Sequence, residues 1–149
     1  MKDPTSEILD AYITLLNGNL TYGTGANIRN FKVVKNISKI KSFQHVLLER
    51  LDLTDDGNND EYMYDCKIYI KIFDGGYKQE ADRSVVDSIS NQIMQAVVGV
   101  TLSMTSFTMF INPVLEGTPD YQEVFANKDE SDDIILSKSL IFKFNVQQK

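Results

Sequence analysis

The sequence has little of what builds cross-links and metal centres, with one cysteine and one histidine in 149 residues. Cys66 cannot form a disulfide within the chain, and together with His45 it cannot supply the full ligand set of a structural zinc site. The fold must therefore be held by side-chain packing. With 42% hydrophobic residues the chain can bury a core of its own, and its length suits a single domain spanning residues 1–149.

Basic residues are also scarce: the chain has 15 lysines and arginines but 21 aspartates and glutamates, which gives a net charge of −6. This charge opposes generic binding to nucleic acid or to an anionic membrane, although a locally basic face stays compatible with it. We expect no sequence-specific nucleic-acid contact. The first ten residues hold no apolar block that would suit a signal peptide, so we expect synthesis and assembly in the cytoplasm.

One uncharged stretch, Ile93 to Leu115, is long enough to cross a bilayer. Its interior is interrupted by polar residues such as Gln95, Thr101 and Ser103, and Gly99 stands where a helix would end. We interpret it as a helix end followed by a strand, with no membrane contact.

Two segments have helical periodicity. Asp3-Pro4 provides a helix start, after which apolar residues recur at helical spacing until Asn17-Gly18. A second apolar stripe ends at Gly99 and predicts a helix with its inward face on Val85, Ile89 and Ile93.

Four segments are predicted as strands by alternation or β-rich composition: Gln44–Leu53, Glu61–Phe73, Leu102–Asn112 and Leu136–Val146. The turn-forming residues Asp55–Asp60 make the first two a hairpin. We expect a loop with one short strand in Leu20–Ser42, and a long acidic loop in Pro113–Asp133. This order predicts an α+β fold, with an antiparallel β-sheet of about four to five strands and two main helices packed on one face.

No candidate for catalysis or ion binding survives inspection. The acids around Asp55–Asp60 resemble a calcium loop, but Met63 stands where the bidentate glutamate belongs, so we expect an exposed turn without a tightly held ion. His45 has no evident nucleophile beside it, and Cys66 lies on the apolar side of a strand. The aromatic residues lack interleaved basic residues and are predicted to pack in the core. We therefore expect no enzyme activity, cofactor or metal.

The pattern of elements resembles the tail-terminator or tail-completion family of tailed bacteriophages over nearly the whole chain. The resemblance lies in five features: the opening helix, the first strand, the central strand, the turn and helix after Gly75-Gly76, and the closing strand. The segments that carry the resemblance are Thr5–Leu16, Phe43–Leu48, Cys66–Ile70, Ala81–Ile93 and Ser139–Val146. The chain departs from the family in two places. The segment before its first long strand is rich in lysine and lacks the usual proline, and the loop Pro113–Asp133 is longer than expected.

The resemblance implies a non-enzymatic subunit of the virion tail or neck. Such subunits form homo-oligomeric rings, hexameric for a terminator, that dock to tail-tube or connector and portal proteins and through which DNA can pass. A connector or stopper ring below the portal, which would be dodecameric, is the alternative, and a small ligand-binding or enzyme-accessory module is the alternative of another class.

The two long polar segments are candidates for contacts between subunits. Either lysines of one copy meet acids of the next, or both charge groups are merely solvated, which surface charges usually are. The candidate contact residues are Lys32, Lys35, Lys39, Lys41, Asp129, Glu130, Asp132 and Asp133.

Overall fold

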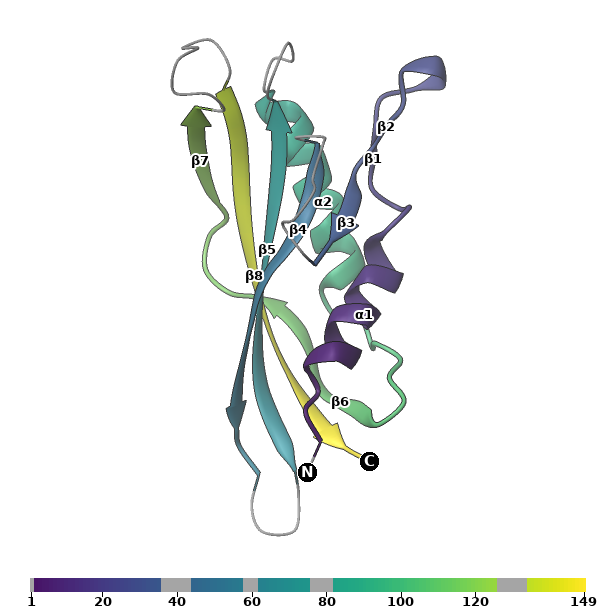
Figure 1. Cartoon of the computed structure of the whole chain (residues 1–149), viewed down its shortest axis with the longest axis vertical. Coiled ribbons are helices and arrows are strands. Elements are labelled where there is room, and N and C mark those ends of the chain that lie inside the picture. Colours follow the sequence, from purple (N-terminus) through teal and green to yellow (C-terminus); the bar gives the residue numbers. More distant parts are fainter. Residues whose placement is uncertain (1, 36–43, 58–61, 76–81, 126–133) are drawn as a thin grey trace.

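The computed structural model describes residues 2–35, 44–57, 62–75, 82–125 and 134–149. Its main feature is a six-stranded sheet with the order β3-β4-β5-β8-β6, in which β7 also pairs with β8 (Figure 1). The strands are β3 (Lys32–Val34), β4 (His45–Asp55), β5 (Met63–Gly75), β6 (Phe107–Leu115), β7 (Asp120–Phe125) and β8 (Ile134–Gln148).

The long strand β8 pairs with two other strands along the same edge. Its first half pairs with β7, and its second half, from Phe142 to Gln148, pairs with β6. The other side of β8 pairs with β5 over its whole length, and β5 in turn pairs antiparallel with β4. The three long strands are strongly twisted, so that β4 and β6 form opposite borders of the lower part of the sheet (Figure 1).

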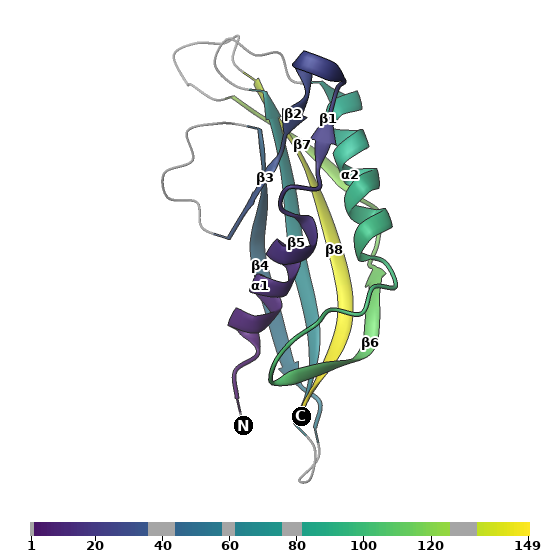
Figure 2. The same cartoon turned by 90° about the vertical axis from the view of Figure 1, so that its right-hand side faces the viewer.

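Two helices, α1 (Thr5–Leu16) and α2 (Arg83–Val97), lie on one face of this sheet (Figure 2). We call the opposite face the outer face. An aspartate lies just before each helix, and its carboxylate accepts a backbone N–H from two residues later: Asp3 from Thr5 at 2.9 Å, and the N-cap residue Asp82 from Ser84 at 2.9 Å. The hydroxyls of Thr5 and Ser84 also donate to these carboxylates, and the hydroxyl bonds, together with the backbone bonds, lower the pKa of both carboxyls.

The core lies between the helices and the inner face of the sheet. α1 buries Ile8, Tyr12 and Leu16, and α2 buries the predicted residues Val85, Ile89 and Ile93, which confirms the predicted helix register. On the sheet, alternate residues of β5 and β8 are buried against them, as period-two patterning predicts. The buried residues are Tyr64, Cys66, Ile68, Ile70 and Ile72 of β5 and Leu136, Leu140, Phe142, Phe144 and Val146 of β8.

The α+β class is confirmed, and the structure adds detail that the sequence did not predict. The sheet has six strands, and its edge pair β3–β4 is parallel. β6 begins at Phe107 and runs through Pro113, and the predicted loop after Asn112 contains β7. The segment after Leu20 contains β3 and also a separate two-stranded sheet of β1 (Thr21–Tyr22) and β2 (Arg29–Asn30), which flank the short helix η1 (Gly25–Asn27).

Candidate functional site

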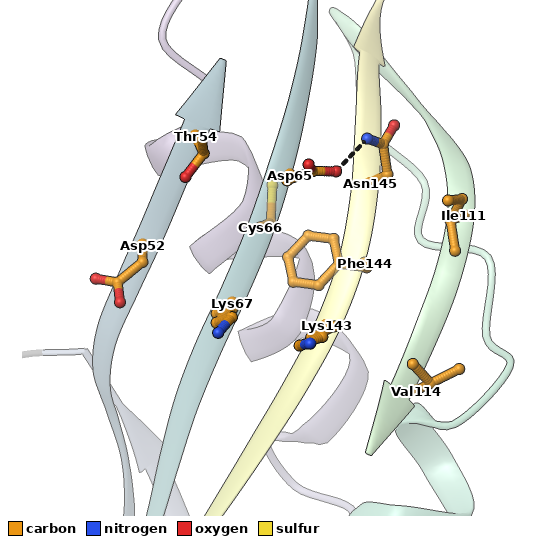
Figure 3. Close-up of a pocket in the computed structure, with 10 residues that line it drawn as sticks. All are labelled: Asp52, Thr54, Asp65, Cys66, Lys67, Ile111, Val114, Lys143, Phe144 and Asn145. Atoms are coloured by element: carbon orange, nitrogen blue, oxygen red, sulfur yellow. Dashed lines mark hydrogen bonds between the residues drawn. The ribbon is translucent and has the colours of Figure 1, made fainter. Parts of the chain in front are cut away.

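The outer face holds a shallow groove of about 530 Å³ that crosses four strands, from β4 to β6 (Figure 3). The register aligns its residues in rows across the sheet. One row runs Asp52, Lys67, Lys143, Val114, and the next runs Thr54, Asp65, Asn145, Ile111. The groove is therefore a strip of sheet surface whose chemistry changes from acidic at β4, through lysines at the centre, to apolar at β6.

The charges in the groove are joined by ion pairs. Glu116, directly after β6, accepts from Lys143 at 3.0 Å and from Lys67 at 3.2 Å. These two lysines lower the pKa of the Glu116 carboxyl. All three side chains are at least 30% exposed, so the pairs fix side-chain positions more than they stabilise the fold.

At the β4 side of the groove, Arg50 pairs with Asp52 at 3.1 Å and its guanidinium lies over the Tyr69 ring. Asp65 accepts a hydrogen bond from the amide of Asn145 at 2.8 Å (Figure 3). Among the described residues, no cation pairs with Asp65. The groove therefore keeps one carboxylate, on β5, without a paired cation.

The β6 border of the groove is apolar and open to solvent. Phe110 is 64% exposed, Ile111 52% and Val114 50%, and Val98, just after α2, is 48% exposed. A hydrogen bond of 2.9 Å from the Gly99 N–H to the Pro113 carbonyl brings the end of α2 against this strand. We call Val98, Phe110, Ile111 and Val114 the β6 patch. It contains four of the seven large hydrophobic residues that are exposed in the described part of the chain, which makes it a candidate interaction surface.

The single cysteine and the single histidine of the chain are both buried. The thiol of Cys66 is buried, and burial raises its pKa to about 12, so it is not a nucleophile near neutral pH. His45 is buried and stacks on Phe73, with ring centroids 4.7 Å apart. In the part of the chain that the structure describes, no three His, Cys, Asp or Glu residues are grouped so that they could hold a metal ion.

A second polar cluster ties β7 to α2. Lys138 of β8 donates to Asp87 of α2 at 2.9 Å and to the Tyr121 hydroxyl of β7 at 3.3 Å. Tyr121 also donates to Asp87, and its ring lies beneath the charged groups of Lys138 and Arg83. The Lys138 side chain is only 11% exposed, so this cluster fixes the upper edge of the sheet.

The predicted contact residues are described only in part. Lys32 and Lys35 are exposed, and Lys35 pairs with Asp10 of its own chain at 2.9 Å. Lys39, Lys41, Asp129, Glu130, Asp132 and Asp133 lie outside the described residues, so the predicted contact stays a prediction. Of the predicted acidic turn, Asp55, Asp56 and Gly57 are exposed, and residues 58–60 lie outside the described part.

The sequence did not reveal the β6 patch. Phe110 was predicted to pack in the core with the other aromatic residues, and so was Tyr62, but the structure exposes both. The register shifts between Met109 and Ile111 and between Ile111 and Val114, which breaks the alternation that the prediction relied on. The only signal in the sequence was the pair of adjacent bulky residues, Phe110 and Ile111, which cannot both face inward on a regular strand.

The comparisons with known proteins concern the fold. No protein-family model matches the sequence, and no curated protein matches it. Among solved structures, the chain is similar to a chain from the virion of a native gene transfer agent particle, with a TM-score of 0.72 and 14% identity over 99% of both chains. At this identity the likeness establishes a shared fold over the whole chain. Within the described residues, no helix is long and apolar enough to cross a bilayer.

Proposed function

We propose that this chain is a structural, non-enzymatic subunit of a virion that assembles as a homo-oligomeric ring, either ending a tail tube or joining tail to head. The observation that carries the proposal is the fold shared with a chain of a gene transfer agent virion. That likeness covers 99% of both chains, so it involves the complete arrangement of helices and strands and not a common sub-motif. On this proposal residues 1–149 act as one domain.

The surface chemistry supports assembly over catalysis. The groove on the outer face is open and contains ion pairs that involve its own side chains, whereas small-molecule sites are concave pockets with a few convergent polar groups. Exposed apolar residues on β6 are instead typical of a surface that is buried against another protein.

The proposal places the protein in the tail or neck of the particle, with assembly in the host cytoplasm. Its neighbours would be a tail-tube protein for a terminator, or portal and connector proteins for the alternative ring below the portal. The net charge of −6 supports a ring through which DNA passes without being bound tightly.

Electron microscopy of purified particles from the organism that encodes the chain, combined with mass spectrometry of the same particles, tests the proposal. We expect the chain among the particle proteins and a ring of density at one end of the tail. Six copies per ring would indicate a terminator and twelve a connector, as the resemblance to the tail-terminator family implies. Absence of the chain from intact particles would refute a virion role.

A further inference from the structure

The strongest unexplained feature of the molecule is that the lower part of its sheet ends in two open borders of different character. On one side, β3 pairs only with His45–Leu47 of β4. Beyond Leu47, no described strand pairs with this side of β4. On the other side, β6 borders the sheet and carries most of the β6 patch (Figure 1).

The register places the two borders level with each other. Ile111 of β6 pairs with Asn145, which pairs with Asp65, which pairs with Thr54 of β4. Thr54 and Ile111 are thus the two ends of one row across the outer face (Figure 3). A neighbour placed beside this molecule in the same orientation would therefore bring its β4 border against the β6 patch.

Strand direction also suits such a neighbour. Each step from β4 to β5, from β5 to β8 and from β8 to β6 is antiparallel, so β6 runs antiparallel to β4. Copies related by rotation about a ring axis would keep this relation, and β6 of one copy would meet β4 of the next in the antiparallel sense. Pro113 and the two register shifts interrupt β6, so the contact is made by side chains and not by a complete backbone ladder.

The two borders are complementary in charge. The open part of β4 and the turn after it carry Glu49, Asp52, Asp55 and Asp56 against one cation, Arg50. β6 has no charged residue, and Lys143 of the adjacent strand β8 shares the carboxylate of Glu116 with Lys67 of β5. Side-by-side placement therefore brings an acidic border within one strand of Lys143, a lysine that shares its acid partner with a second lysine.

We infer that the β6 patch of one copy packs against the Leu48–Asp55 border of β4 in a second copy of this chain, which makes the contact head-to-tail. The inference rests on the proposed ring assembly and deepens it by naming the two surfaces that meet. A head-to-tail contact of unlike surfaces closes into a ring when the rotation between copies permits, and it leaves no apolar border exposed.

Cross-linking tests which surfaces meet. In the double variant Thr54→Cys, Ile111→Cys, a short bis-maleimide should produce a ladder of dimer, trimer and larger species on a denaturing gel. Each single variant should stay monomeric, and the unmodified chain controls for Cys66, which is buried. Both engineered sites are exposed, so the fold is retained. A dimer from Ile111→Cys alone would reveal a two-fold contact between patches and overturn the inference, as would a double variant without cross-links.

Sedimentation of the intact chain provides an independent test. Ile111→Glu should weaken self-association by about tenfold or more, because a central apolar contact is replaced by a charge of the same sign as the β4 border. Thr108→Glu is the matched control, since Thr108 is exposed on the same strand outside the patch and should leave association unchanged. Circular dichroism and thermal melting would confirm that both variants fold. Equal association of wild type and Ile111→Glu, or a wild type that stays monomeric, would overturn the inference.

These outcomes separate the two proposals. If the chain is found in virions but the cross-links do not form, the named surfaces are wrong and the virion role stands. If the cross-links form but the chain is absent from particles, the contact stands and the virion role is refuted.

Discussion

At the scale of single residues, Cys66 illustrates how burial sets chemistry. Its thiol lies on the inner side of β5, close enough to Tyr12 of α1 that its charge would raise the pKa of the Tyr12 hydroxyl, which burial already raises. Burial raises the pKa of Cys66 from 9.0 to about 12, because a thiolate in the core would lose its hydration. Neither group ionises readily in the folded protein.

The raised pKa of Cys66 predicts a loss of stability at alkaline pH. In the unfolded chain the thiol ionises above about pH 9, whereas the folded protein holds its proton until about pH 12. The stabilisation is thus complete below pH 9 and is lost as the pH rises through that window. Urea unfolding at about pH 8 and about pH 10.5 should show a larger loss for wild type than for Cys66→Ala. Equal losses would mean that Cys66 is not linked to folding.

The core position of Ile89 gives a second prediction at this scale. Ile89 is 0% exposed on the face of α2 that packs on the sheet, so Ile89→Asp should cost several kcal/mol by burying an unpaired charge. Asn91→Asp is the control, because Asn91 is exposed on the same helix. Thermal melting should show a large drop for the first variant and little change for the second. An unchanged melting temperature for Ile89→Asp would contradict the observed helix register.

At the scale of elements, one polar cluster joins β7 and β8 to α2. Asp87, Tyr121 and Lys138 join β7, β8 and α2, and the Lys138 charge is almost fully enclosed. Asp87→Ala would leave that charge without its partner, and we expect a loss of about 1–2 kcal/mol because Asp87 itself is partly exposed.

A double-mutant cycle checks this. Lys138→Met removes the enclosed charge, so adding Asp87→Ala to it should cost clearly less than Asp87→Ala alone. Denaturant unfolding of the four proteins measures the coupling. If the two losses of stability simply add, Asp87 and Lys138 are not energetically coupled.

Elements with a strong periodic signal were predictable from the sequence, and edge elements were not. β5, β8 and α2 alternate or repeat over many residues because one side of each is buried, so all three were predicted close to their observed positions. β7 is short and its residues Asp120, Tyr121 and Gln122 read as loop. β6 was placed too early because Asn112-Pro113 reads as a strand end, although an edge strand can accommodate proline at an irregular position.

The candidate site could not be predicted from the sequence, for a related reason. Its rows combine residues from strands that are far apart in the chain, such as Asp52 and Val114, and only the strand order places them on one surface. The parallel pairing of β3 with β4 is equally non-local, since three residues carry no pattern that specifies a partner. What the sequence did indicate was the scarcity of residues suited to catalysis.

At the scale of the whole molecule, assembly could use two kinds of contact. The inferred contact would join the β6 patch to the β4 border, whereas the other candidate contact would join charged residues such as Lys32 and Lys35 to acids of a neighbour. Lys32 is exposed in β3 without an ion pair among the described residues, so it is free to meet an acid of a neighbour. Lys35 already pairs with Asp10, and because both are well exposed that pair is weak and can exchange.

The charge contact is tested by removing charge without changing chain length. Replacing Asp129, Glu130, Asp132 and Asp133 with their amides should leave the melting temperature nearly unchanged, because surface charges contribute little to folding. Deletion of Lys128–Asp133 serves as the stronger variant. If these acids meet Lys32 and Lys35 of the next copy, both variants should fold yet fail to enter virions, and the charge-reversal variant Lys32→Glu, Lys35→Glu should fail in the same way. Normal incorporation of the amide variant would show that the acids are merely solvated, and would leave the β4 and β6 borders as the contact to be tested.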